Sequence, residues 1–241
     1  MKILSIGNSF STDAHRFLHT LAKLNGFDIQ TANLFIGGCS LETHWQNVLQ
    51  NNAYYDYEIN GNEAKRKISI AQALEADMWD IVTLQQASSY SGIFETYEPY
   101  LTSLAETVRI AQPQTKLYFH RTWSYETGSE HPGFINYNCD SRKMYECIEK
   151  ASIKATEKIG ADIIPSGTVI QHLREKTKEF NYRNGGLSLC RDTFHLSEDL
   201  GRYAAAATWL HTLTDEKLAT KEFENMDFNL LKIITDIVNL Y

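Results

Sequence analysis

The sequence predicts an α/β fold in which a mostly parallel, five-stranded sheet lies between two layers of helices. Short apolar runs, typical of strands buried on both faces, alternate along the chain with longer segments whose apolar residues recur at helical spacing. Strands separated by helices indicate a parallel sheet with helices on both faces. The 241 residues, 43% of them hydrophobic, suffice for one domain spanning 1–241 with a sizeable core.

Each element follows from a local pattern. The first strand is the apolar run Lys2 to Ile6, and the first helix is expected from Asp13 to Leu24, where Asn25-Gly26 provides a stop. Further strands are expected at 29–35, 80–84, 116–119 and 162–164, and further helices at 41–49, 99–111, 138–159 and, capped by Ser197, 200–210. Asn60-Gly61 tolerates the positive φ angles of a type I′ turn, so a small hairpin is inserted around 54–68.

Composition excludes several classes of partner. The net charge is −7 and the Lys and Arg residues are scattered, so no basic stripe can follow a nucleic acid backbone. The four cysteines lack zinc-ligand spacing and are expected to be free thiols. The N-terminal apolar run is too short for a signal or a membrane span, so we expect a cytoplasmic protein without a membrane partner, or a secreted or periplasmic one if a signal peptide has been removed.

Ser9 follows the first predicted strand directly, in the segment Gly7-Asn8-Ser9-Phe10-Ser11. In an α/β sheet the ligand crevice lies beyond the carboxyl ends of the strands. The backbone N–H groups that begin the next helix favour negative charge developing there. Ser9 is therefore a candidate nucleophile, and the alternative is that Ser9 or Ser11 only caps the helix.

A base for this serine is available near the other end of the chain. A serine hydroxyl needs a base to take its proton, and a histidine held by a carboxylate is the usual one. In the segment Asp192-Thr193-Phe194-His195, the Asp192 carboxylate can fix the tautomer of His195 and stabilise its imidazolium form. Ser9, Asp192 and His195 are thus the candidate catalytic residues.

With these residues in view, nearly the whole chain resembles the SGNH, or GDSL-like, hydrolases. Their first block is Gly-Asp-Ser, one residue and Ser after strand one, which residues 7–11 match with Asn8 in place of Asp. Their last block is Asp-x-x-His before a final helix, which Asp192 and His195 match in type, spacing and placement. The resemblance implies the SGNH-hydrolase fold, with Ser9 as nucleophile, His195 as base and Asp192 orienting it.

The resemblance also implies an oxyanion hole. Its donors would be the Ser9 N–H, the Gly38 N–H in the second block, and a side-chain amide from the third block. The third block usually contains Gly-x-Asn-Asp, whereas this chain has Gln85-Gln86-Ala87-Ser88-Ser89, which resembles a Gln-Gly-Glu-Ser variant of sialate and acetylxylan esterase branches. We expect Gln86 to be the amide donor, with Gln85 as the alternative. Gly38 could instead serve turn geometry alone, and the glutamines could satisfy backbone groups.

The expected substrate is a small-molecule or carbohydrate ester, especially a short acyl ester such as an O-acetyl sugar. Trp123 and Tyr125 follow a predicted strand and, with Gln85, are candidates for substrate binding, although core packing explains Trp123 equally well. Neither a metal nor a cofactor is expected. His15 and His19 lie four apart on the first helix without an evident third ligand, and we expect them on a solvated helix face.

Two rival functions remain open. A non-catalytic, flavodoxin-like domain could cradle a phosphate or nucleotide with the hydroxyl-rich segment 8–12, which leaves Asp192 and His195 unexplained. A pseudoenzyme could keep the fold and bind glycan without turnover. Fold alone does not choose among these functions.

Overall fold

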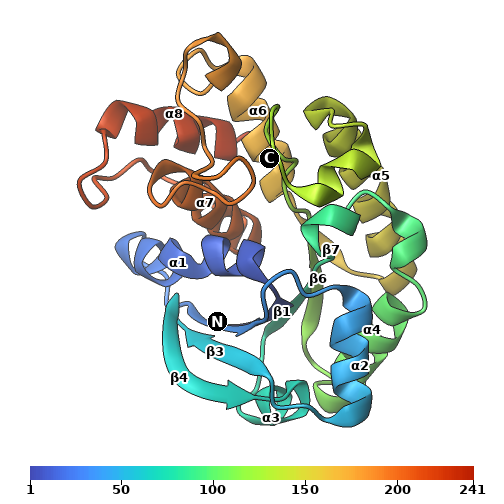
Figure 1. Ribbon diagram of the computed structural model, residues 1–241. Coiled ribbons are helices and arrows are strands. Elements are labelled where there is room, and N and C mark those ends of the chain that lie inside the picture. The colour runs from blue at the N-terminus through green and yellow to red at the C-terminus, as the bar shows by residue number, and fades with distance from the viewer.

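The computed structural model describes all 241 residues as one seven-stranded sheet with eight α-helices on its two faces (Figure 1). The strands are β1 (Lys2–Gly7), β2 (Gln30–Phe35), β3 (Tyr55–Ile59), β4 (Asn62–Ile68), β5 (Ile81–Leu84), β6 (Lys116–His120) and β7 (Asp162–Ile164). The helices are α1 (Ser9–Leu24), α2 (Leu41–Gln50), α3 (Ile70–Glu75), α4 (Tyr100–Ala111), α5 (Ser141–Ile159), α6 (Ser166–Lys176), α7 (Leu200–Thr214) and α8 (Phe228–Val238).

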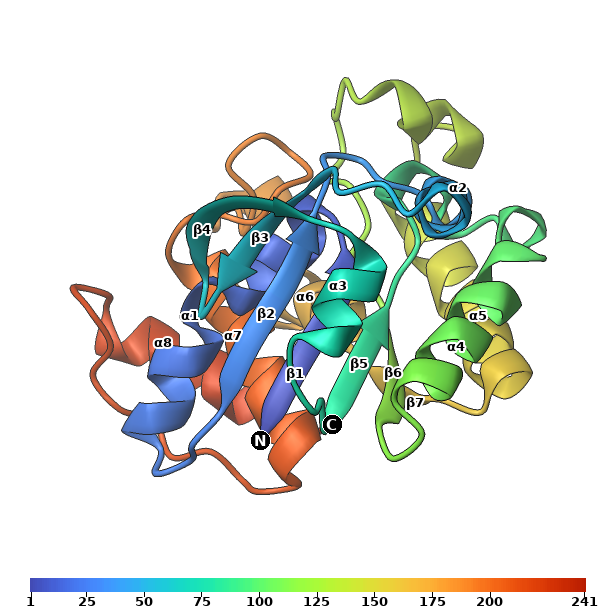
Figure 2. The same cartoon turned by 90° about the horizontal axis from the view of Figure 1, so that it is seen from below.

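The predicted three-layer α/β class is confirmed, but the sheet is larger than predicted. Its order is β4-β3-β2-β1-β5-β6-β7, and the five predicted strands β2, β1, β5, β6 and β7 all pair in parallel. The hairpin is not a separate insertion but part of the sheet, because β3 pairs antiparallel with β2 (Figure 2). This pairing provides hydrogen-bond partners for backbone groups that β2 would otherwise expose at the sheet edge. Asn60 and Gly61 have φ angles of 51° and 73°, as the predicted turn requires.

Three helices lie outside the sequence-based prediction. Helix α3 is a six-residue element, too short for its periodicity to be recognised. Helices α6 and α8 do carry apolar residues at helical spacing, and Asp227 caps α8 by accepting from the N–H groups of Asn229 and Leu230. The predicted cap of α7 shifts by two residues, since Asp199 rather than Ser197 is its N-cap.

Helix α1 begins at Ser9, four residues earlier than predicted. The Asn8 side chain accepts a hydrogen bond from the Phe10 N–H at 3.1 Å, and the Ser11 hydroxyl accepts from the Asn8 N–H at 3.1 Å. This capping box satisfies two of the N–H groups that a helix leaves without partners at its start. Ser9 therefore occupies the first position of the helix, directly after β1.

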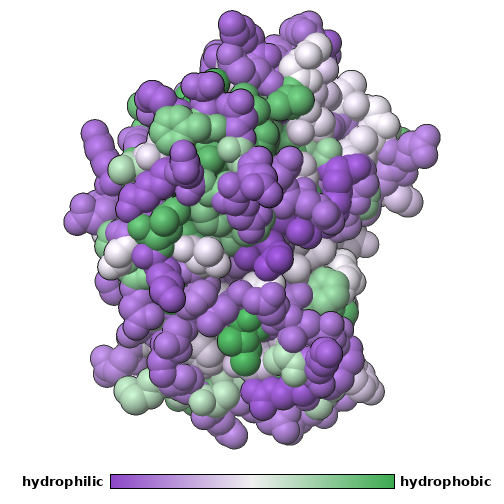
Figure 3. Space-filling model, turned by 90° about the vertical axis from the view of Figure 1, so that its left-hand side faces the viewer, coloured by the Kyte–Doolittle hydropathy of each residue, from purple (hydrophilic) through white to green (hydrophobic).

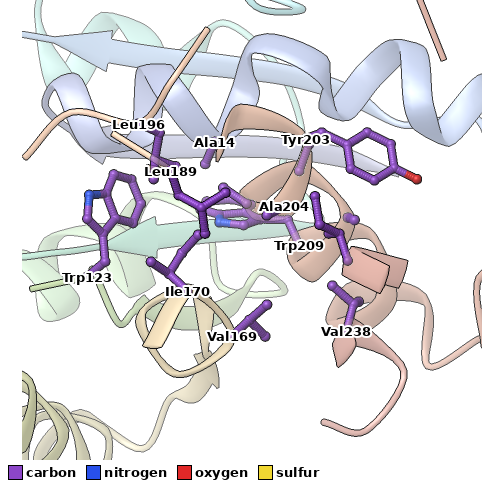
Figure 4. Close-up of a cluster of buried hydrophobic side chains, with 14 of the residues drawn as sticks. Ala14, Trp123, Val169, Ile170, Leu189, Leu196, Tyr203, Ala204, Trp209 and Val238 are labelled. Atoms are coloured by element: carbon purple, nitrogen blue, oxygen red, sulfur yellow. The ribbon is translucent and has the colours of Figure 1, made fainter. Parts of the chain in front are cut away.

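The core consists of one apolar layer on each face of the sheet. In β1, Ile3 packs in one layer and Leu4 and Ile6 pack in the other, as the two-residue period of a strand dictates. The first layer lies beneath α1, α6, α7 and α8, and Figure 4 shows part of it: Trp123, Ile170, Leu189, Leu196, Tyr203 and Trp209 gathered between α1 and the later helices. Leu196 anchors the residues just after His195 in this core.

On the face drawn in Figure 3, hydrophilic residues predominate and the apolar ones form small separate groups. No helix is long and apolar enough to cross a membrane.

Candidate active site

The predicted nucleophile sits where β1 passes into α1. A Cβ atom on Gly7 would lie 2.1 Å from the Ser11 Oγ atom, so a larger residue there would displace the hydroxyl that caps α1. Beyond this turn Ser9 is half-buried and lines a cavity of about 400 Å³. The carboxyl end of β1 thus presents the hydroxyl to the crevice that the sheet topology predicts.

Three predicted catalytic side chains form one hydrogen-bonded chain. The Ser9 Oγ atom lies 2.9 Å from His195 Nε2, and His195 Nδ1 lies 2.7 Å from Asp192 Oδ2. Both distances are those of well-formed hydrogen bonds. Residues 186 positions apart in the sequence are thereby brought together.

The loop that carries Asp192 and His195 is tightly built. Asp192 Oδ1 accepts from the His195 N–H at 2.7 Å, while the Arg191 N–H donates to the His195 carbonyl at 3.0 Å. Thr193 has a φ of 71°, which is strained for a β-branched residue, and its hydroxyl donates to Ser129 Oγ at 2.9 Å. The strain is typical of a backbone held in place for a functional site.

Asp192 is poised to remain ionised. Partial burial raises the pKa of its carboxyl, but hydrogen bonds from the side chain and backbone N–H of His195 outweigh this effect, and the pKa of Asp192 lies below its ordinary value. An ionised Asp192 keeps the Nδ1 proton on His195 and leaves Nε2 to accept from Ser9.

A buried carboxylate ties this loop to the helix that carries Ser9. Asp13, on α1, is 1% exposed, and its carboxylate accepts from Arg191 Nη1 at 3.0 Å and Arg202 Nε at 2.8 Å. It also accepts from the Leu196 N–H at 2.9 Å. Asp13 therefore fixes the residues on both sides of the Asp192–His195 segment against α1, a role that sequence analysis missed.

The two backbone N–H groups predicted for an oxyanion hole are available. Neither the Ser9 N–H nor the Gly38 N–H donates to another group of the protein, and both residues line the cavity. Gly38 has a φ of 63°, so glycine is also required by the turn itself. The requirement for glycine in the turn and the proposed N–H donor role of Gly38 are therefore compatible.

The expectation that Gln86 supplies the third donor is wrong. Gln86 is 1% exposed, and its amide nitrogen donates to the carbonyl and the hydroxyl of Thr96, each at 3.1 Å. Its amide oxygen accepts from the backbone N–H groups of Leu41 and Ala87. Gln86 fastens the loops after β2 and β5, which was the structural alternative.

Gln85 is also buried and does not line the cavity, so it is not in a position to bind substrate. Its amide nitrogen donates to Asn8 Oδ1 at 2.7 Å, and its amide oxygen accepts from His120 Nδ1 at 2.8 Å. Asn8 Nδ2 in turn donates to the Cys39 carbonyl at 3.1 Å. Asn8 thus connects the loops after β1, β2 and β5, and an aspartate there could not donate to Cys39. Asn8 and Gln85, the residues at which this chain departs from the first and third SGNH blocks, are therefore hydrogen-bonded to each other.

Trp123 and Tyr125 do not contact the cavity either. Both are fully buried. The Trp123 ring stacks on Phe10 at a centroid distance of 4.3 Å, and its indole N–H donates to the Phe194 carbonyl. These side chains support the site from beneath, and the prediction that they touch substrate is corrected to core packing.

Ser88 is the residue of the third block that does line the cavity. It lies three residues beyond Gln85, and its Oγ atom is 2.7 Å from the Tyr125 hydroxyl. Tyr125 thus orients the Ser88 hydroxyl at the wall of the cavity without contacting the cavity itself. His131 lines the cavity as well, with Nδ1 accepting from the Gly133 N–H at 3.0 Å, which leaves the proton on Nε2.

Histidines are also buried in the core, contrary to one expectation. His15 is 1% exposed rather than solvated. It faces the core layer beneath α1, where its Nε2 atom forms a hydrogen bond with Ser5 Oγ at 2.8 Å. His19 bonds to the Ile29 carbonyl. Burial lowers the pKa to about 3 for each of three histidines: His15, His44 and His120. No group of three or more His, Cys, Asp or Glu side chains is arranged to hold a metal ion, and all four cysteines are free.

Comparison with solved structures defines the class of this fold. A protein from Slackia heliotrinireducens, provisionally designated an SGNH hydrolase, gives a TM-score of 0.59 at 21% identity over 88% of this chain and 98% of that one. An acetylxylan esterase from Geobacillus stearothermophilus gives a TM-score of 0.56 at 14% identity over 91% of this chain and 97% of that one. The predicted SGNH-hydrolase fold is confirmed.

Within that class the chain belongs to the family described as a domain of unknown function (DUF4886), which matches residues 2–231. The crystal structure of a DUF4886 family protein from Bacteroides uniformis ATCC 8492 is 37% identical, covers 100% of this chain and 93% of its own, and gives a TM-score of 0.92. No curated protein matches.

Proposed function

We propose that this protein is a serine esterase that hydrolyses short acyl esters, including O-acetyl groups on carbohydrates, through an acyl-enzyme on Ser9. The observation that carries the proposal is the hydrogen-bonded chain from Ser9 through His195 to Asp192. A nucleophile, a base and a residue that orients the base, each within hydrogen-bond reach of the next, are the parts that acyl transfer requires.

The proposed reaction has two halves. His195 Nε2 takes the Ser9 proton while the oxygen attacks the ester carbonyl, and the protonated imidazole then gives that proton to the departing alcohol. Water, deprotonated by the same imidazole, attacks the acyl-enzyme and releases the acid and Ser9. Asp192 stabilises the imidazolium in both halves.

The negative oxygen of each tetrahedral intermediate would be held by the Ser9 and Gly38 N–H groups, which have no partner within the protein. Loss of one such donor typically lowers kcat by about 100-fold to 1,000-fold. Since the Gln86 amide is occupied, we assign the third donor to the Ser88 hydroxyl, with Tyr125 holding it in place.

The cavity favours a small polar substrate. Of the 12 residues that line it, two, Phe35 and Phe194, are hydrophobic. A long acyl chain would find only these two hydrophobic side chains to pack against, whereas an acetyl group on a hydroxyl-rich alcohol needs few such contacts. A carbohydrate ester therefore suits the cavity better than a lipid.

The test is hydrolysis of p-nitrophenyl acetate and an O-acetylated sugar by wild type, Ser9→Ala and Ser103→Ala. Ser103 lies on α4, away from the cavity, and controls for the chemical change. We expect turnover by the wild type and Ser103→Ala and at least a 1,000-fold loss in Ser9→Ala. Equal activity in all three proteins would exclude Ser9 as nucleophile. Absence of wild-type turnover on a series of esters would favour the binding-domain or pseudoenzyme function.

A further inference from the structure

Two arginines line the same cavity as Ser9. Arg191 precedes the Asp192–His195 segment, and Arg202 lies in the first turn of α7. Both converge on Asp13, which follows Ser9 by four residues and so lies on the same face of α1. Both guanidinium groups therefore lie on the side of α1 that carries the Ser9 hydroxyl, at the wall of the same cavity.

The charges of this cluster do not balance. The Asp13 carboxylate accepts from Arg191 Nη1, Arg202 Nε and the Leu196 N–H, which fills the acceptor positions of its two oxygens. Both arginines form their ion pairs with Asp13, and no other carboxylate lies within salt-bridge distance of either one. Two positive charges thus share one negative charge, and the cluster keeps a net charge of about +1 in a chain whose net charge is −7.

Part of the hydrogen-bonding capacity of these arginines is also unused. Arg202 donates to Asp13 through Nε alone, and its two terminal nitrogens have no partner within the protein. The Arg202 side chain is 16% exposed and the Arg191 side chain 32% exposed, and both border the cavity. Asp13 holds each guanidinium in a fixed orientation, so little entropy would be lost when a ligand binds.

We propose that Arg202, assisted by Arg191, is an anion subsite, and that the preferred substrate is an ester bearing a compact oxyanion such as a carboxylate or sulfate. This inference rests on the proposed esterase function and adds the charge of the substrate to it. The planar edge of a guanidinium matches two oxygens of such a group. An acidic sugar that carries an acyl ester, with its anionic group about one ring away from the ester, has the required chemistry.

The experiment compares two esters that differ in charge. The anionic probe is 4-acetoxybenzoate and the neutral probe is its methyl ester. Both are assayed with wild type, Arg202→Gln, Arg202→Lys and the control Arg183→Gln, which removes one charge from an exposed residue that forms no ion pair. The measured quantity is the ratio of kcat/KM for the anionic probe to that for the neutral probe.

We expect the wild type to favour the anionic probe, and Arg202→Gln to lower the ratio by about 10- to 100-fold, mainly through KM. Arg202→Lys should restore part of the preference, and Arg183→Gln should keep the wild-type ratio. An equal loss on both probes in Arg202→Gln would assign Arg202 a structural role and overturn the proposal, as would a wild type without preference.

A binding experiment separates this proposal from the proposed function. Calorimetric titration with 4-hydroxybenzoate, the anionic product, needs no turnover. Binding to Ser9→Ala that is lost in Ser9→Ala/Arg202→Gln would support the anion subsite even if no ester were hydrolysed. Turnover of both esters with no Arg202-dependent binding of the anion would refute the subsite and leave the esterase proposal intact.

Discussion

The substitution Asp13→Asn tests how the two halves of the site are held together. It keeps the shape of the side chain but removes the negative charge from a residue that is 1% exposed. The ion pairs with Arg191 and Arg202 have N–O distances of 3.0 and 2.8 Å, and the Leu196 N–H donates to the same carboxylate. All of these groups lie on the segments that flank His195.

The expected cost follows from burial. Breaking a buried ion pair by removing one partner typically costs about 3–5 kcal/mol. Since both arginines are partly exposed, we take the lower end, about 3 kcal/mol. For a chain of this size that corresponds to a fall in Tm of about 6–12 °C. kcat should also fall, because His195 loses its fixed position relative to Ser9.

The assay is urea unfolding combined with ester hydrolysis, with Asp236→Asn as the matched control. Asp236 pairs with Lys232 at 2.7 Å, but their side chains are 59% and 57% exposed, so this pair should contribute at most about 0.5 kcal/mol. If Asp13→Asn and Asp236→Asn lowered the free energy of unfolding equally, the clamp assigned to Asp13 would be refuted.

Three further predictions concern the network around the cavity. Asn8→Asp should lower the free energy of unfolding by about 2 kcal/mol, because a buried carboxylate would face the Cys39 carbonyl; unchanged urea midpoints would contradict this. Ser88→Ala should lower kcat by about 100-fold or more with little change in KM, since it removes the donor proposed to act only in the transition state; a change confined to KM would assign Ser88 to substrate binding. His15, His44 and His120 stay neutral in the folded protein, whereas the unfolded chain protonates them below pH 6.5. The free energy of unfolding should therefore decrease as the pH is lowered below 6.5, by up to about 4 kcal/mol per pH unit. Equal stability at pH 7 and pH 5 would show that these three histidines are not buried as described.

The candidate catalytic residues could be found in the sequence because their signals are local. Ser9 comes directly after the end of a strand, and the short spacing of Asp192 and His195 lets one loop hold both. Most strand and helix positions followed from periodicity for the same reason, apart from shifts of a few residues at their ends and from α3, α6 and α8, which were not predicted.

The features that could not be predicted depend on contacts between segments that are distant in the sequence. Asp13 and Arg202 are 189 positions apart, and nothing near either residue marks them as partners. The resemblance to the SGNH hydrolases suggested an amide donor at Gln86, but contacts with Thr96 and Leu41, which only the fold brings close, set the direction of its side chain. Likewise, the pairing of β3 with β2 extends the sheet in a way that the hairpin pattern alone did not indicate.

The most direct test of the central claim is covalent labelling with a fluorophosphonate, in which an activated serine oxygen displaces fluoride from phosphorus. Wild type and Ser9→Ala would be treated identically and analysed by intact mass and peptide mapping. If Ser9 is the nucleophile, the wild type should carry one adduct on Ser9, the adduct should be absent from His195→Ala, and Ser9→Ala should carry none. Labelling of another residue, or of Ser9→Ala to the same extent, would contradict this assignment.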